Sequence, residues 1–145
     1  MTTEQSVLLK LIRQSQFDTV EDIAWDEIDL DALYEEASQQ AVLGLIAPLI
    51  PEAYSNDTWR KAQLQQEASY IRYCFAQDEL KKVLDEADIP FVILKGNAAA
   101  IYYKEPMRRA MGDIDFLVPQ DRFEDARVAF TSSGYSGICN LTLTR

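Results

Sequence analysis

Two carboxylates, Asp113 and Asp115, open the apolar run Asp113 to Val118. If this run is a β-strand, alternate side chains point to the same face, so the two carboxylates lie side by side. A divalent cation between them would relieve their repulsion, and Mg²⁺ binds such carboxylates together with phosphate oxygens. The pair therefore indicates a metal site for phosphoryl or nucleotidyl transfer. A solvated strand edge is the alternative interpretation.

A second candidate is Lys95–Gly96, which follows the apolar run Phe91 to Leu94 and precedes the small residues that begin at Asn97. Glycine lets the backbone approach a ligand closely, and the first turn of a helix favours anions. The unit therefore predicts a phosphate-binding turn in which Lys95 neutralises phosphate. A lysine that only reaches solvent is the alternative.

Two more residue pairs follow this turn. Arg108 and Arg109 could present a cationic fork to a triphosphate, or they could be ordinary loop charges. Tyr102 and Tyr103 are interpreted as packing residues rather than catalytic ones.

The composition limits the chemistry. Histidine is absent, which excludes Ser-His-Asp and Cys-His catalysis and most zinc sites. The net charge of −10 disfavours nucleic acid as a partner. No apolar run approaches the ~20 residues of a membrane span, and Met1 to Glu4 shows no signal peptide, so we expect a cytoplasmic protein. Cys74 and Cys139 have no metal-ligand spacing, and Cys74 is expected to be a buried thiol.

The first half of the chain predicts helices. Leu8, Leu11 and Ile12 mark the first, and Asp29 caps a second whose apolar repeat runs to Leu45. A longer third helix opens near residues 55–57. We expect one broad buried face on it, made of Leu64, Ala68, Ile71, Phe75, Leu80, Val83, Leu84 and Ala87.

The second half alternates strands and helices. Residues 91–94 predict a strand buried on both faces, residues 98–103 a short helix, and residues 113–118 a second strand. Asp121 and Glu124 resemble a capping box at the start of a further helix, and residues 138–143 predict a third strand. The fold class is α+β: a helical N-terminal region, residues 1–88, packed on a small mixed β-sheet in residues 89–145.

Three stretches carry a resemblance to a known family: residues 93–100, 102–109 and 112–118. Together they resemble the uncharacterised nucleotidyltransferase family of the polymerase-β-like superfamily, over about residues 25–135. The resemblance implies a nucleotidyltransferase-type sheet. It also implies that Gly96 and Asn97 bind nucleotide phosphates, with Lys95 and Arg108 at recurring positions of the family.

The resemblance also implies that Asp113 and Asp115 hold Mg²⁺ or Mn²⁺. The superfamily uses a third carboxylate on a later strand, and no Asp or Glu follows Asp125. Two alternatives account for this: an N-terminal fragment, in which the core of residues 89–145 is incomplete, or a shortened form with weakened or lost catalysis.

The leading functional hypothesis is Mg²⁺-dependent transfer of a nucleoside monophosphate from a nucleoside triphosphate to an unidentified hydroxyl acceptor. The alternative is a catalytically degenerate domain that acts in nucleotide sensing or protein–protein interaction. Homo-oligomerisation through the apolar faces of the helices is left open.

Overall fold

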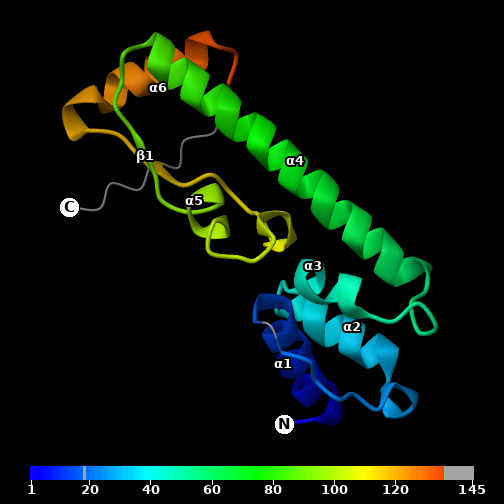
Figure 1. Cartoon of the computed structure of the whole chain (residues 1–145). Helices are drawn as coiled ribbons and strands as arrows, with labels where there is room; N and C mark the ends of the chain where they lie inside the picture. Colours follow the sequence, from blue (N-terminus) through cyan, green and yellow to red (C-terminus); the bar gives the residue numbers. More distant parts are fainter. Residues whose placement is uncertain (18, 136–145) are drawn as a thin grey trace.

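The computed structural model describes residues 1–17 and 19–135. Helices α1–α3 cluster at one end of the long helix α4, and β1, β2 and α6 lie toward its other end (Figure 1). The α-helices and strands are α1 (Thr3–Gln16), α2 (Leu30–Gln39), α3 (Leu43–Ile46), α4 (Asp57–Glu86), β1 (Val92–Ile93), α5 (Asn97–Ala100), β2 (Phe116–Leu117) and α6 (Phe123–Ser132). Short 3₁₀-helices are η1 (Trp25–Glu27), η2 (Ala47–Leu49), η3 (Pro106–Arg108) and η4 (Gln120–Arg122). The α+β class is confirmed.

The N-terminal helices begin at well-formed caps. Thr2 and Gln5 make a reciprocal capping box at α1, and the Asp29 carboxylate accepts from the backbone N–H groups of Asp31 and Ala32 at α2. The cap at Asp29 confirms the prediction. The apolar faces meet in a core of Val7, Leu8, Leu11, Leu33, Ala37, Leu45, Ile46, Ala47, Ile50 and Trp59.

Helix α2 is shorter than expected. It ends at Gln39 rather than continuing to Leu45, because Ala41 adopts a left-handed conformation with φ of 55°. The Val42 N–H then donates to the Ala37 carbonyl, which satisfies an end of the helix. Leu45 is still buried because the chain turns into α3 and re-enters the same core. The apolar repeat therefore predicted the burial of Leu45 correctly, although it did not predict where the helix ends.

Ala41→Gly is expected to raise the free energy of unfolding by roughly 0.5–1 kcal/mol. A glycine adopts the left-handed conformation without the Cβ penalty that alanine carries there. Urea unfolding measures the change. Ala76→Gly, at an exposed position inside α4, is the matched control and should destabilise by about 1 kcal/mol. Destabilisation by both substitutions would contradict the assignment of Ala41 as the helix-terminating residue.

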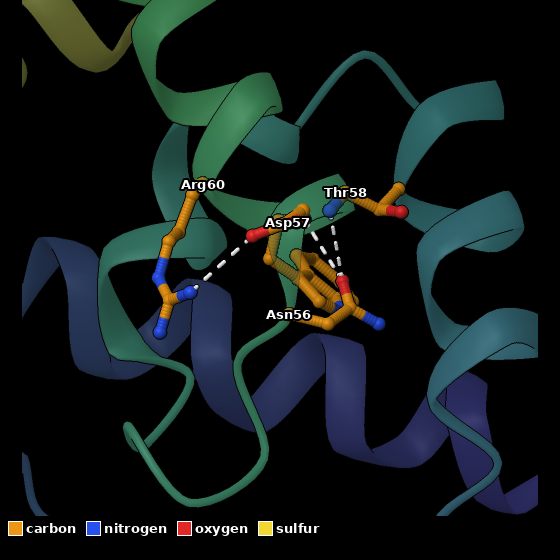
Figure 2. Close-up of polar contacts among 5 residues, drawn as sticks. Asn56, Asp57, Thr58 and Arg60 are labelled. Carbon is orange, nitrogen blue, oxygen red and sulfur yellow. Dashed lines mark hydrogen bonds and ion pairs between the residues drawn. The ribbon is translucent and has the colours of Figure 1, made fainter.

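Helix α4 begins at Asp57 and is capped by Asn56, both within the predicted stretch. The Asn56 side-chain oxygen accepts from the Thr58 and Trp59 N–H groups at 3.0 and 3.3 Å (Figure 2). The helix runs for 30 residues, which corresponds to about 45 Å. Its first turn contributes Trp59 to the N-terminal core, and its last turns contribute Leu80 and Leu84 to a second core. Helix α4 therefore connects the two cores.

The predicted buried face of α4 is partly wrong. Leu64, Ile71 and Phe75 are 66%, 51% and 70% exposed, whereas Leu80, Val83 and Leu84 are buried as expected. At about 100° per residue, the exposed stripe lies roughly opposite the buried side chains of Tyr73 and Leu80. The helix carries an apolar stripe on each of two opposite faces, and the described part of the chain covers one of them.

Strands β1 and β2 pair antiparallel, with Val92 opposite Leu117 and Ile93 opposite Phe116. Both are shorter than predicted, and a mixed sheet is not confirmed among the described residues. Burial of β1 on both faces is wrong, since Val92 is 61% and Leu94 49% exposed. Only one face of the sheet is covered by the second core. The predicted third strand, residues 138–143, lies outside the described residues.

The second core covers the face of the sheet opposite to the one that carries Val92 and Leu117. Its buried members are Leu80, Leu84, Ile89 and Ala126, with Phe91, Ile114, Phe116, Val118 and Phe130 packed against them. The expected capping box is wrong: Asp121 lies inside η4, and α6 begins after it at Phe123. Helix α5 is also shorter than the predicted 98–103. Within residues 1–17 and 19–135, no helix is long and apolar enough to cross a membrane.

Candidate functional site

The first sequence-predicted pair to meet in space is Lys95 and Asp115. Lys95 follows β1, Asp115 precedes β2, and the Leu94 N–H donates to the Asp115 carbonyl at 2.9 Å. The antiparallel pairing therefore brings the two residues together. The Lys95 Nζ lies 2.9 Å from Asp115 Oδ2, with side chains 66% and 42% exposed. An exposed pair of this kind contributes at most about 1 kcal/mol to stability. Both groups remain accessible to a ligand.

Gly96 makes the turn after Lys95. Its φ of 68° and ψ of −118° lie in a region that residues with a Cβ rarely enter. The Tyr73 side chain of α4 packs directly on Gly96, where a Cβ would overlap the tyrosine hydroxyl oxygen. The Gly96 carbonyl accepts from the N–H groups of Ala99 and Ala100 and so starts α5. The glycine is required by both backbone conformation and space.

Asn97 lies against a polar patch on the middle of α4. Its Nδ2 donates to the Cys74 Sγ at 3.5 Å, and Cys74 is half-buried rather than buried as expected. The Tyr73 hydroxyl, Gln77 Oε1 and Asn97 Oδ1 are buried without a hydrogen-bond partner among the described residues. Buried polar groups are normally paired. The Tyr73 hydroxyl, which packs on Gly96, and Asn97 Oδ1 therefore give the Lys95–Asn97 turn unused hydrogen-bonding capacity.

The Tyr73 hydroxyl lies within the electrostatic reach of the candidate site. Burial raises the pKa of this hydroxyl above 10.0, the Arg109 charge lowers it in part, and the Asp115 carboxylate raises it further. The side chain is only 6% exposed because it packs on Gly96 inside the fold. It supports the site rather than lining its open side.

Tyr73→Phe is expected to weaken the loss of stability at alkaline pH. Below pH 10.0 the hydroxyl is protonated in the folded and unfolded chains alike. Above it, the unfolded chain loses the proton first, so the free energy of unfolding falls as pH rises toward the folded-state pKa. Phenylalanine removes this contribution. At pH 7 it should leave the free energy of unfolding nearly unchanged, because the lost hydroxyl has no hydrogen-bond partner within residues 1–17 and 19–135. Urea unfolding at a series of pH values measures both.

The matched control for this prediction is Tyr102→Phe. Tyr102 is 84% exposed, so its removal should leave the alkaline profile close to that of the unsubstituted chain. Identical profiles for Tyr73→Phe and Tyr102→Phe would contradict the burial argument.

Arg108 and Arg109 are held in different ways. The Arg108 guanidinium pairs with Glu105 at 2.8 Å within the loop that contains η3. The Gln66 side chain of α4 donates to the Arg109 carbonyl at 2.7 Å and to the Met107 carbonyl at 3.2 Å. The loop is thereby fixed to α4, and Arg109 is the arginine whose charge acts on Tyr73. The close approach of Gly44 to the Arg108 carbonyl adds a contact from α3.

Asp113 is exposed and stands two residues before Asp115, just outside the paired part of β2. The described residues contain no group of three or more His, Cys, Asp or Glu side chains arranged to hold a metal. The two carboxylates offer hard, accessible oxygen donors, which suit Mg²⁺ or Mn²⁺. The donor set fits a metal that also takes phosphate oxygens from a substrate.

A surface hollow of about 320 Å³ lies elsewhere, lined by Tyr34, Asp57, Thr58, Lys61 and Gln65. Thr58 is roughly 20 Å along α4 from Tyr73, at 1.5 Å per residue. The hollow is shallow and distant from the carboxylates, so we place the candidate site at Lys95 and Asp115 on chemical grounds.

Sequence reasoning missed the contribution of α4 to this site. Tyr73 packs on Gly96, and Gln66 donates to the carbonyls of Met107 and Arg109, so both contact the loops that carry the candidate residues. A signal was available: Tyr73, Gln77, Leu80 and Leu84 follow one another at spacings of four, three and four, which places them on one helix face. Tyr73 and Gln77 are polar, so a pattern of apolar residues alone does not indicate that face.

Comparison with known proteins adds one finding to this geometry. A search of curated proteins and a search of solved structures both found no match. The sequence profile of a family described as "Uncharacterised nucleotidyltransferase" matches residues 26–141, which include Lys95, Gly96, Asp113 and Asp115. This match confirms the resemblance found in the sequence. The chain belongs to the uncharacterised nucleotidyltransferase family.

Proposed function

We propose that the protein transfers a nucleoside monophosphate from a nucleoside triphosphate to a hydroxyl acceptor in the presence of Mg²⁺ or Mn²⁺. The observation that carries the proposal is the 2.9 Å ion pair between Lys95 and Asp115, which joins the Gly96 turn to the Asp113–Asp115 segment. Membership of a nucleotidyltransferase family supports the same chemistry.

Each residue has a role in this proposal. Lys95 neutralises phosphate charge, and the turn at Gly96 and Asn97 lets the backbone approach the triphosphate. Arg108, and Arg109 beside it, add positive charge from the loop. Asp113 and Asp115 would hold the metal, which supplies neutralisation of the charge that develops on the transferred phosphate.

The overall reaction is a substitution at the α-phosphorus. The acceptor oxygen forms a bond to this phosphorus while the bond to the bridging oxygen of the β-phosphate breaks. The products are a phosphodiester and pyrophosphate, and the acceptor proton passes to solvent. Lys95 and the backbone at Gly96 would hold the triphosphate so that the α-phosphorus faces the acceptor.

Isothermal titration tests the binding part of the proposal. ATP, GTP, CTP and UTP are each titrated with Mg²⁺ into the intact chain and into the Asp115→Asn variant. We expect at least one nucleotide to bind, and the variant to bind it roughly tenfold or more weakly because a metal ligand is lost. Asp121→Asn, an exposed aspartate in η4, is the matched control and should bind like the unsubstituted chain. Absence of binding by all four nucleotides, or equal affinity of the Asp115 variant, would overturn the proposal.

A second candidate is a nucleotide-binding domain without transfer activity, used in sensing or in protein–protein interaction. The observation that favours it is again the ion pair, since the Lys95 ammonium already neutralises Asp115. A domain built this way could bind triphosphate through Lys95 with little dependence on a metal. Titration with and without EDTA separates the candidates: metal-independent binding without pyrophosphate release supports sensing, and metal-dependent binding with pyrophosphate release supports transfer.

A further inference from the structure

No described element covers the exposed apolar stripe on α4. Leu64, Ala68, Ile71 and Phe75 follow one another at spacings of four, three and four, and the three large members are 66%, 51% and 70% exposed. At about 100° per residue all four fall within a sector of roughly 60°. This is the spacing at which one helix packs along another.

The stripe is oriented away from the rest of the molecule. The opposite face of α4 is occupied by Trp59 in the N-terminal core and by Leu80 and Leu84 in the second core. In the view of Figure 1 the ribbon of α4 has no other element along its outer side between its two ends. A second long helix could therefore approach the stripe from outside.

The charges beside the stripe have opposite signs at its two ends. Arg60 and Lys61 lie one turn before Leu64, and Asp78 and Glu79 lie one turn after Phe75, all of them exposed. Beyond them stand Asp57 at the start of the helix and Lys82 near its end. The sequence of charges is reversed in sign about a point between Ser69 and Tyr70.

We propose that two copies of the chain associate through α4, antiparallel, about a two-fold axis near Ser69 and Tyr70. In this arrangement Leu64 of each copy packs beside Phe75 of the other, and Ala68 beside Ile71. The proposal rests on the exposure and charge pattern of α4 and is independent of the proposed catalytic function.

The antiparallel arrangement places opposite charges against each other on both sides of the apolar stripe. Residues on the same side of two antiparallel helices face each other. Arg60 then faces Asp78 of the second copy on one side, and Lys61 faces Glu79 on the other. The two-fold axis repeats both contacts at the opposite end. A parallel pair would instead place basic against basic and acidic against acidic, which is unfavourable.

Charge complementarity also explains how association could overcome the overall charge. The chain carries a net charge of −10, which opposes self-association through an arbitrary surface. The α4 face is balanced instead, because Asp57, Glu67, Asp78 and Glu79 are matched by Arg60, Lys61, Arg72 and Lys82. The existing Arg60–Asp57 ion pair, at 3.4 Å, is exposed and can exchange for an intermolecular one (Figure 2).

Sedimentation equilibrium over a wide concentration range measures the association. We expect a reversible monomer–dimer equilibrium for the intact chain. Phe75→Gln should weaken it by about tenfold or more, because Phe75 supplies much of the apolar contact. Val128→Gln, at an exposed apolar position on α6 outside the stripe, is the matched control and should leave the dissociation constant unchanged. Circular dichroism checks that all variants remain folded.

A charge exchange tests the orientation. One double variant carries Arg60→Glu with Lys61→Glu, and the other carries Asp78→Lys with Glu79→Lys. Each double variant alone places like charges at both ends of an antiparallel pair, so each should dimerise about tenfold or more weakly. An equimolar mixture restores opposite charges at both ends and should form a heterodimer.

Three results would overturn the inference. The intact chain could remain monomeric at every concentration, Phe75→Gln could dimerise like the intact chain, or the double variants alone could dimerise as tightly as it does. The last result would indicate a parallel or unrelated contact. A nucleotide-binding failure in the titration described above would leave each of these outcomes unaffected.

Discussion

Asp115→Asn is expected to lower the rate of nucleotidyl transfer by roughly a thousandfold. Loss of a metal-binding carboxylate removes several kcal/mol of transition-state stabilisation, and about 4 kcal/mol corresponds to a factor of about 10³. The change is isosteric, and the exposed Lys95–Asp115 ion pair that it breaks contributes at most about 1 kcal/mol to folding. Pyrophosphate release with the best-binding nucleotide measures the rate, and thermal unfolding measures stability in parallel.

Asp121→Asn is the control for this loss. It removes a carboxylate of the same kind from η4 and should retain full activity. Equal activity of the Asp115 variant and the intact chain would contradict the assignment of Asp115. Inactivity of the intact chain with all four nucleotides would instead contradict the proposed function, so the two failures are distinct.

Gly96→Ala is expected to destabilise the fold by roughly 3 kcal/mol or more. Alanine at φ of 68° and ψ of −118° carries a backbone penalty of about 1–3 kcal/mol. Its Cβ would also overlap the buried Tyr73 hydroxyl, and forced overpacking adds a further ~1–3 kcal/mol. The midpoint of thermal unfolding should fall by on the order of 10 °C. Any turn that does form should lie displaced from α4 and bind nucleotide poorly.

Gly112→Ala is the matched control, because no described residue other than its two chain neighbours lies within 4 Å of the Cβ it would add. Its stability should stay within about 0.5 kcal/mol of the unsubstituted chain. A second comparison separates space from backbone strain. Gly96→Ala combined with Tyr73→Ala should remove the overlap but keep the φ penalty, so the two changes should be less damaging together than their sum. Strict additivity would argue against the contact between the two residues.

Local signals in the sequence predicted much of the fold. Asp29 and Asn56 lie at helix starts because a short polar side chain there can accept from free N–H groups, an interaction that needs only neighbouring residues. The apolar runs before Lys95 and after Asp113 are also signals made of neighbouring residues, and they predicted the two strands. Their antiparallel pairing then brought Lys95 and Asp115 together. The segments that carry the candidate site were therefore predictable.

Long-range packing was not predictable in the same way. Helix α4 has apolar stripes on opposite faces, and periodicity alone does not tell which of them the rest of the chain covers. The turn at Ala41 needed a left-handed residue that is usually glycine, so its sequence gave no stop signal. Tyr73 reaches Gly96 across more than twenty residues of sequence, and no local rule connects the two.

Because α4 is one continuous helix, local unfolding at one of its ends affects its middle turns. The turn of α4 that carries Tyr73 and Cys74 contacts Gly96 and Asn97, yet it lies between two cores that stabilise only the ends of the helix. Helical segments propagate cooperatively, so fraying that starts at Trp59 extends inward toward Tyr73. Local unfolding of the N-terminal bundle would thus loosen the Lys95–Asn97 turn, although this turn lies outside the N-terminal core. Amide hydrogen exchange in the middle of α4 would report the state of both ends at once.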